Sequence, residues 1–218
     1  MSIITVTNGR DRGTGSLREA IASAQNGDTI KFSSVLANKT IKLTSGDIDI
    51  AKNITIDGSS APNLSLSGNK SNRIFQVEKF RTVTLKDLTF IEGREVTPGE
   101  KKGEGGAIKV RQYGTLVVEN SNFRNNVAER GGAIHIGYGA SATVTDSLFD
   151  SNDGSIANDG FSAGAISTGG GGQGSKVIHN RSDRNGNNAF LDIRNTTFTN
   201  NKGSYGNGTE KVRITLPS

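Results

Sequence analysis

Hydrophobic and polar residues alternate over short segments along most of the chain, as in Ile54-Thr55-Ile56-Asp57. A period of two residues is typical of β-strands with one buried face, and such short runs cannot form stable helices. Gly and Asn interrupt the segments, for example at Asn26-Gly27-Asp28 and Ser67-Gly68-Asn69, where turns are expected. The pattern therefore predicts many short strands, at residues 29–32, 40–44, 54–57, 64–67, 82–85 and 143–145.

Two phrases recur along the chain. The first is Gly-Gly-Ala-Ile or a close variant, and it is followed by a second phrase that contains Phe and ends in Asn. The copies lie at residues 105–108, 131–134 and 163–166 for the first phrase, and at 120–126, 146–152 and 195–201 for the second, with a degenerate copy at 87–93. Gly106 and Gly132 are 26 residues apart, as are Phe123 and Phe149. A period in the twenties made of short strands is typical of a β-solenoid.

The predicted fold is all-β: a right-handed parallel β-helix in which equivalent residues of successive coils stack on one another. Stacking predicts three interior columns and one outward row. The interior columns are Ile108, Ile134 and Ile166; Phe123, Phe149 and Phe198; and an Asn ladder at Asn126, Asn152 and Asn201. The outward row contains Lys109, His135 and Ser167, which alternate with the buried Ile positions.

A short helix is expected near the start, because Ser16-Leu17-Arg18-Glu19 has the form of a capping box and precedes an apolar stripe. A solenoid needs its open apolar end covered, so this helix is predicted to be the N-terminal cap. We expect a single domain over 1–218, with the N-terminal strand and cap in 1–28 and the coils in 29–216. Insertions are expected near 94–104 and 170–188, and a repeat of about 25 residues predicts seven or eight coils.

Composition narrows the class of protein. Hydrophobic residues make up 32% of the chain, which is too few to give each of several helices an apolar face in a compact helical core. Cys is absent, which excludes disulfides and thiolate metal sites, and no stretch is long and apolar enough to span a membrane. The net charge of +5 is small for a dedicated nucleic-acid binder but permits attraction to acidic polysaccharide. The first residues lack a secretory signal, and we expect the chain to be part of a longer exported protein.

The run from Gly15 to Ile21, followed by Gly27-Asp28-Thr29-Ile30 and Ile54-Thr55-Ile56-Asp57-Gly58, resembles bacterial surface proteins with a Ser-Leu-Arg-Glu-Ala leader motif. That family often has Cys before the Ser, where this chain has Gly15. The Gly-Gly-Ala-Ile and Phe-x-x-Asn phrases resemble the repeats of polymorphic outer-membrane proteins. Both groups belong to the right-handed parallel β-helix, or pectin-lyase-like, architecture. The resemblance implies an extracellular or cell-surface location, but this architecture serves enzymes, adhesins and passive stalks alike.

Candidate chemistry lies on the outward row. A polysaccharide lyase needs a cation to neutralise the uronate and a base to remove the proton next to the carboxylate. Lys109, Arg111 and His135 could supply these groups, and Tyr138 adds a binding residue. The flanking acids are Glu104, Asp150 and Asp153. Outward positions of a solenoid are polar in any case, so ordinary solvated residues are the favoured interpretation.

Two loops carry further candidates. The segment after the glycine run at residues 169–174 contains His179, Arg181 and Arg184, which are candidates for a specific binding contact. Asp146, Asp150 and Asp153 could offer oxygen ligands to Ca²⁺, although their spacing fits no EF-hand loop. No other cofactor is expected.

The sequence favours a non-catalytic β-helix module of an exported cell-surface protein, with a role in adhesion or as a scaffold and with an acidic polysaccharide or cell-surface glycan as the ligand. The alternatives are a polysaccharide lyase or epimerase acting on acidic glycans, and a purely structural spacer. An enzyme predicts a groove where acidic and basic groups converge with at least one perturbed pKa. A scaffold predicts a smooth face.

Overall fold

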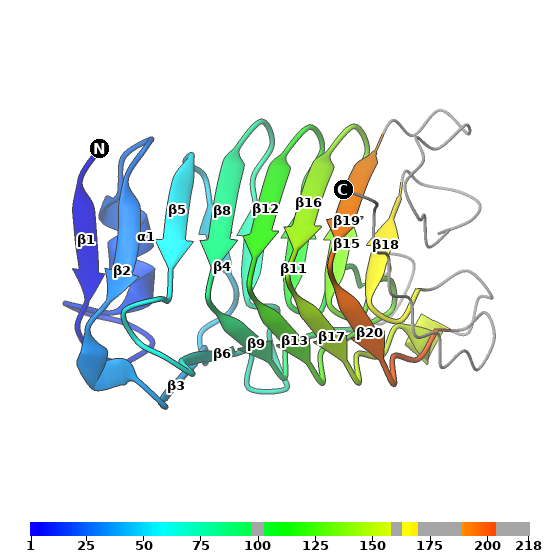
Figure 1. The fold of residues 1–218 in the computed structure, drawn as a ribbon, viewed down its shortest axis with the longest axis horizontal. Helices are drawn as coiled ribbons and strands as arrows, with labels where there is room; N and C mark the ends of the chain where they lie inside the picture. The colour runs from blue at the N-terminus through cyan, green and yellow to red at the C-terminus, as the bar shows by residue number, and fades with distance from the viewer. Residues whose placement is uncertain (97–102, 158–162, 170–188, 204–218) are drawn as a thin grey trace.

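The computed structural model describes residues 1–96, 103–157, 163–169 and 189–203, which form a parallel β-solenoid of about five turns (Figure 1). Every strand pairing among these residues is parallel. The predicted β-helix with one short N-terminal helix is therefore confirmed. The described residues contain no helix long and apolar enough to cross a membrane.

Three sheets, here called A, B and C, run along the solenoid. Sheet A contains β1 (Ile3–Val6), β2 (Thr29–Phe32), β5 (Ile54–Asp57), β8 (Thr82–Lys86), β12 (Thr115–Glu119), β16 (Ser141–Thr145) and β19 (Phe190–Arg194). Sheet B contains β3 (Thr40–Lys42), β6 (Ser65–Ser67), β9 (Thr89–Ile91), β13 (Asn122–Arg124), β17 (Leu148–Asp150) and β20 (Thr197–Thr199). Sheet C contains β4 (Ile48–Ile50), β7 (Phe75–Val77), β11 (Ile108–Val110), β15 (Ile134–Ile136) and β18 (Ile166–Thr168).

The predicted interior columns are confirmed. Phe90, Phe123, Phe149 and Phe198 stack with ring centroids 4.6–5.0 Å apart and nearly parallel planes. Ile108, Ile134 and Ile166 pair in register on sheet C and are buried. These columns fill the space between the three sheets, which excludes water from the centre of every coil.

The Asn ladder also forms as predicted. The Nδ2 of Asn126 donates to Oδ1 of Asn152 at 2.9 Å, and the Nδ2 of Asn152 donates to Oδ1 of Asn201 at 2.9 Å. The same amides donate to the backbone carbonyls of Phe90 and Phe123. Asn126 and Asn152 are fully buried. Their Oδ1 atoms accept from the turn N–H groups of Gly93 and Asn126, while the carbonyls that accept from their amides belong to strands of sheet B.

The helix α1 (Leu17–Ser23) starts at the expected Ser, whose Oγ accepts from the backbone N–H of Glu19 at 3.2 Å. The Glu19 carboxylate accepts from the backbone N–H of Gly15 rather than from that of Ser16, so the capping box is displaced by one residue. Leu17, Ala20 and Ile21 are buried in the same core cluster as the coils. The helix therefore covers apolar side chains at the N-terminal end, where it lies beside β1 and β2 (Figure 1).

The described residues form about five turns, fewer than the seven or eight coils expected for the chain. Register partners on sheet A are 33 residues apart from Thr82 to Thr115 and 49 apart from Ser141 to Phe190, so these two coils use more chain than one period.

The predicted insertion near 94–104 is shorter than expected, because β10 (Arg94–Glu95) pairs with β14 (Val127–Ala128). Short 3₁₀ turns lie at Ser34–Leu36 and Ser155–Ala157. The insertion at 170–188 and the end of the predicted coil region, 204–216, lie outside the described residues.

Candidate functional site

The outer face of sheet C carries one polar side chain from each of its five strands. Each strand has three residues, and the central one points outward because its two neighbours are buried in the core. The register aligns Asp49, Gln76, Lys109, His135 and Ser167 across successive coils. We call these five residues the outer row. Sequence reasoning placed Lys109, His135 and Ser167 in this row, and the structure confirms their alignment.

His135 points outward but is not solvated, which corrects the expectation of an ordinary surface residue. Its side chain is 2% exposed. Gly169 lies close over the ring, since a Cβ added there would stand 2.8 Å from the imidazole Cε1. Nδ1 is 2.9 Å from Ser167 Oγ, and Nε2 is 3.6 Å from Glu104 Oε1. Neighbouring coils and the segment around Glu104 thus enclose the ring.

Burial lowers the pKa of His135 to about 4, and the cations Lys109 and Arg130 act in the same direction against the opposing effect of Glu104. The imidazole is therefore neutral at pH 7 and carries one proton. A carboxylate only accepts hydrogen bonds, so the proton belongs on Nε2 toward Glu104, and Nδ1 accepts from the Ser167 hydroxyl. Nδ1 is then hydrogen-bonded, while the Nε2 proton faces Glu104 beyond hydrogen-bond distance.

Glu104 joins two members of the outer row. Its Oε2 is 3.0 Å from Lys109 Nζ, while Oε1 faces His135. Burial acts to raise the pKa of Glu104, but His135 and Lys109 oppose it and the net shift is downward. The carboxylate is consequently ionised at neutral pH and neutralises Lys109.

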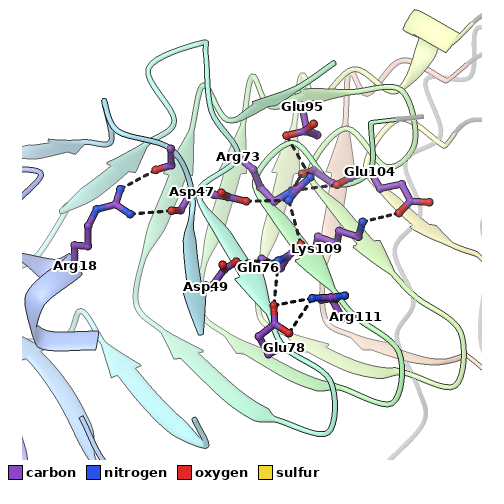
Figure 2. Close-up of polar contacts among 12 residues, drawn as sticks. Arg18, Asp47, Asp49, Arg73, Gln76, Glu78, Glu95, Glu104, Lys109 and Arg111 are labelled. Carbon is purple, nitrogen blue, oxygen red and sulfur yellow. Dashed lines mark hydrogen bonds and ion pairs between the residues drawn. The ribbon is translucent and has the colours of Figure 1, made fainter. Parts of the chain in front are cut away.

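The second predicted cation, Arg111, is also paired. Its NH1 donates to both carboxylate oxygens of Glu78 at 3.0 Å, and Glu78 in turn accepts from Gln76 at 3.1 Å. Gln76 also donates to Asp49 Oδ1 at 2.8 Å. Figure 2 shows these contacts passing from coil to coil. Lys109 and Arg111, which the sequence suggested as cations for an acidic ligand, are thus both neutralised by carboxylates of the protein.

Arg73 is the most buried cation of this face, with 8% of its side chain exposed. Its guanidinium contacts Asp47 at 2.9 Å and Glu95 at 3.2 Å, and Nε donates to the carbonyl of Glu104 at 3.2 Å (Figure 2). Glu95 and Glu104 flank the segment 96–103 in the sequence, so one side chain contacts both of its ends. Arg73 therefore positions the backbone that carries Glu104.

A pocket of about 560 Å³ opens beside the outer row. It is lined by Lys79, Glu104, Lys109, Val110, Arg111, Gln112, His135, Gly137, Tyr138 and Gly169. Lys109, Arg111, His135 and Tyr138, which the sequence offered as candidates, all line this pocket, and Lys79 and Gln112 were not among the candidates. The smooth face expected of a scaffold is not what this region presents.

The order Ser167–His135–Glu104 has the residue types of a nucleophile, base and acid. Ser167 is fully buried, however, and does not line the pocket, so a substrate in the pocket does not reach its Oγ. These three residues form a closed polar cluster.

The Ca²⁺ candidates each accept local hydrogen bonds. Asp146 accepts from Asn195 at 2.5 Å, and Asp153 accepts from the backbone N–H of Ser155 at 2.8 Å. Hydrogen bonds from Asn200 and Thr199 lower the pKa of Asp150. No group of three or more metal-ligating side chains gathers in the part of the chain that the structure describes. A Ca²⁺ site here stays a prediction, and His179, Arg181 and Arg184 lie outside the described residues.

Sequence reasoning also missed Phe80 and Tyr113, which are exposed beside the pocket and stack on each other with ring centroids 5.3 Å apart. A signal was present, because each stands two residues before a Thr that begins a strand of sheet A. Tyr138, which was predicted, lies 5.8 Å from Tyr113.

None of the protein-family models matches this chain, and a search of curated proteins finds no match.

Proposed function

We propose that this chain is a non-catalytic glycan-binding module of an exported cell-surface protein, acting in adhesion. The observation that carries the proposal is the pocket on the outer face of sheet C, whose cations Lys109 and Arg111 are balanced by Glu104 and Glu78. A concave site with several polar groups and one tyrosine, Tyr138, suits a hydroxyl-rich ligand. The resemblance to bacterial surface proteins supports the extracellular or cell-surface location.

The states of His135 and Lys109 support binding without turnover. Nδ1 of neutral His135 is occupied by its hydrogen bond with Ser167, and a conjugate acid with a pKa of about 4 makes a weak base at neutral pH. Lys109 would have to lose both its proton and its ion pair with Glu104 before it could accept a proton from a substrate.

A polysaccharide lyase or epimerase is the second candidate, because acidic and basic groups converge in the pocket and the pKa of His135 is strongly shifted. In that role Lys109 and Arg111 would neutralise the uronate carboxylate and His135 would remove the neighbouring proton. The role requires a substrate carboxylate to displace Glu104 and Glu78 from their cations.

The test combines turnover and binding on the same polysaccharides. The protein is incubated with pectate, alginate, glycosaminoglycans and neutral glycans, with and without Ca²⁺, while ultraviolet absorbance reports unsaturated product. We expect binding without product. Product that disappears in His135→Ala would overturn the proposal in favour of a lyase. Neither binding nor product would overturn it in favour of a structural spacer.

A further inference from the structure

Three aromatic side chains form a strip at the corner between sheets C and A. Phe80, Tyr113 and Tyr138 come from the turns that precede β8, β12 and β16 in successive coils. The rings of Phe80 and Tyr113 are nearly parallel, with an interplanar angle of 8°. Tyr138 meets Tyr113 at 87° and lines the pocket. We call these three residues the aromatic strip.

The aromatic strip is exposed to solvent, and the backbone at two of its residues has an unfavourable conformation. Phe80 is 67% exposed and Tyr113 is 48% exposed, so much of their apolar surface remains in water. Both backbones have φ of 60°, a left-handed conformation that bulky residues rarely adopt. The residue of the next coil in register is Gly139, which also has a positive φ and leaves room for the Tyr113 ring. The turn has a positive φ in all three coils, but it does not need a bulky, exposed residue there, so the aromatic side chains of Phe80 and Tyr113 point to a functional contact.

A polar row runs parallel to the strip. Lys79, Gln112 and Tyr138 share one register position in the same three coils, and all three line the pocket. Lys79 and Gln112 are exposed. Lys79 has no acidic partner within the described ranges, whereas Lys109 and Arg111 are paired. The corner therefore presents a stacked pair of partly exposed aromatic rings beside hydrogen-bonding groups, and Lys79 is its one cation without an acidic partner among the described residues.

We propose that the aromatic strip is an apolar contact subsite for a neutral glycan that lies along the solenoid axis and reaches the pocket. The carbon–hydrogen faces of pyranose rings are apolar and can pack against the exposed surface of the stacked Phe80 and Tyr113 rings, while the hydroxyl groups at their rim hydrogen-bond to the polar row. Successive coils repeat about every 4.8 Å, so the strip and the row both extend in the direction of a linear chain. The inference rests on the proposed function and replaces the acidic ligand with a neutral one.

The experiment measures the affinity for neutral probes (cello-, manno- and N-acetylchito-oligosaccharides) and acidic probes (oligogalacturonate and oligoguluronate) by calorimetry at low and high salt. We expect tighter binding of a neutral probe, with an affinity that salt does not change. Phe80→Ala and Tyr113→Ala should each weaken it about tenfold, and Tyr113→Phe should retain it. Val35→Ala, at an exposed apolar residue on another turn, is the matched control and should bind like the parent. Thermal unfolding checks that each variant folds.

The outcomes separate the two proposals. Salt-sensitive binding of acidic probes that survives Phe80→Ala and Tyr113→Ala would overturn the aromatic strip and leave glycan binding in place. Absence of binding to every probe would overturn both.

Discussion

The interior Phe column and the outer row of sheet C obey the same coil-to-coil register but differ in sequence. The column has the same residue in four coils, Phe90, Phe123, Phe149 and Phe198, with centroids about one coil spacing apart. The outer row has a different residue in each of five coils, from Asp49 to Ser167. Repetition stabilises the interior, because Phe123 and Phe149 each stack on an identical ring in both neighbouring coils.

The outer row is stabilised instead by hydrogen bonds and ion pairs between unlike residues. Gln76 donates to Asp49, Lys109 pairs with Glu104, and His135 meets Ser167. Such contacts require different partners in neighbouring coils, so the row cannot repeat. The difference indicates that the interior specifies the fold and that the outer face was free to acquire a site.

The largest expected difference in stability is between removing a buried aromatic ring and removing an exposed one. Phe123→Ala should lower the free energy of unfolding by about 4 kcal/mol, because it removes a fully buried ring from the column. Phe80→Ala should cost less than about 1 kcal/mol, since its ring is mostly exposed. Chemical denaturation of the two variants measures both. Equal losses would mean that the aromatic strip serves the fold.

A smaller effect is expected at Arg73. Arg73→Met should cost about 3 kcal/mol, because Asp47 and Glu95 would lose their partner next to a buried position. Hydrogen exchange should also quicken at β10, where Glu95 lies. Arg124→Met, at an exposed residue of sheet B, is the control. A loss no larger than that of the control would show that Arg73 does not hold this segment.

The pH dependence should report on His135. Its pKa is about 4 in the folded protein against 6.5 ordinarily, so between these values the unfolded chain binds a proton that the folded chain excludes. This contribution to stability is complete above pH 6.5 and is lost as the pH falls toward 4, by roughly 3 kcal/mol in all. His135→Gln should flatten the decline between pH 6.5 and 4. His179→Gln, at the other histidine, should preserve it, and parallel declines in parent and His135→Gln would contradict the burial of this ring.

Much of the fold follows from repeats that can be read directly, because Phe123 and Phe149 or Gly106 and Gly132 mark the register without knowledge of the loops. The burial of His135 could not be predicted, since it depends on Glu104 and Gly169, which belong to no alternating segment.

The pairing of Phe80 with Tyr113 was hidden for a similar reason. These residues are 33 positions apart, whereas the visible repeat is 26, and only the strand register aligns them. The alternation of polar and apolar residues predicts whether a side chain points into the core or outward. What surrounds that side chain depends on segments outside the repeat.

The most direct test of binding without catalysis is mass spectrometry of an oligosaccharide recovered after equilibrium binding to the intact chain. A neutral probe, retained by the parent protein and lost with Phe80→Ala and Tyr113→Ala, should be recovered at its original mass. An acidic or neutral probe recovered as shorter or unsaturated fragments, with the conversion lost in His135→Ala, would contradict the proposal and identify the pocket as catalytic.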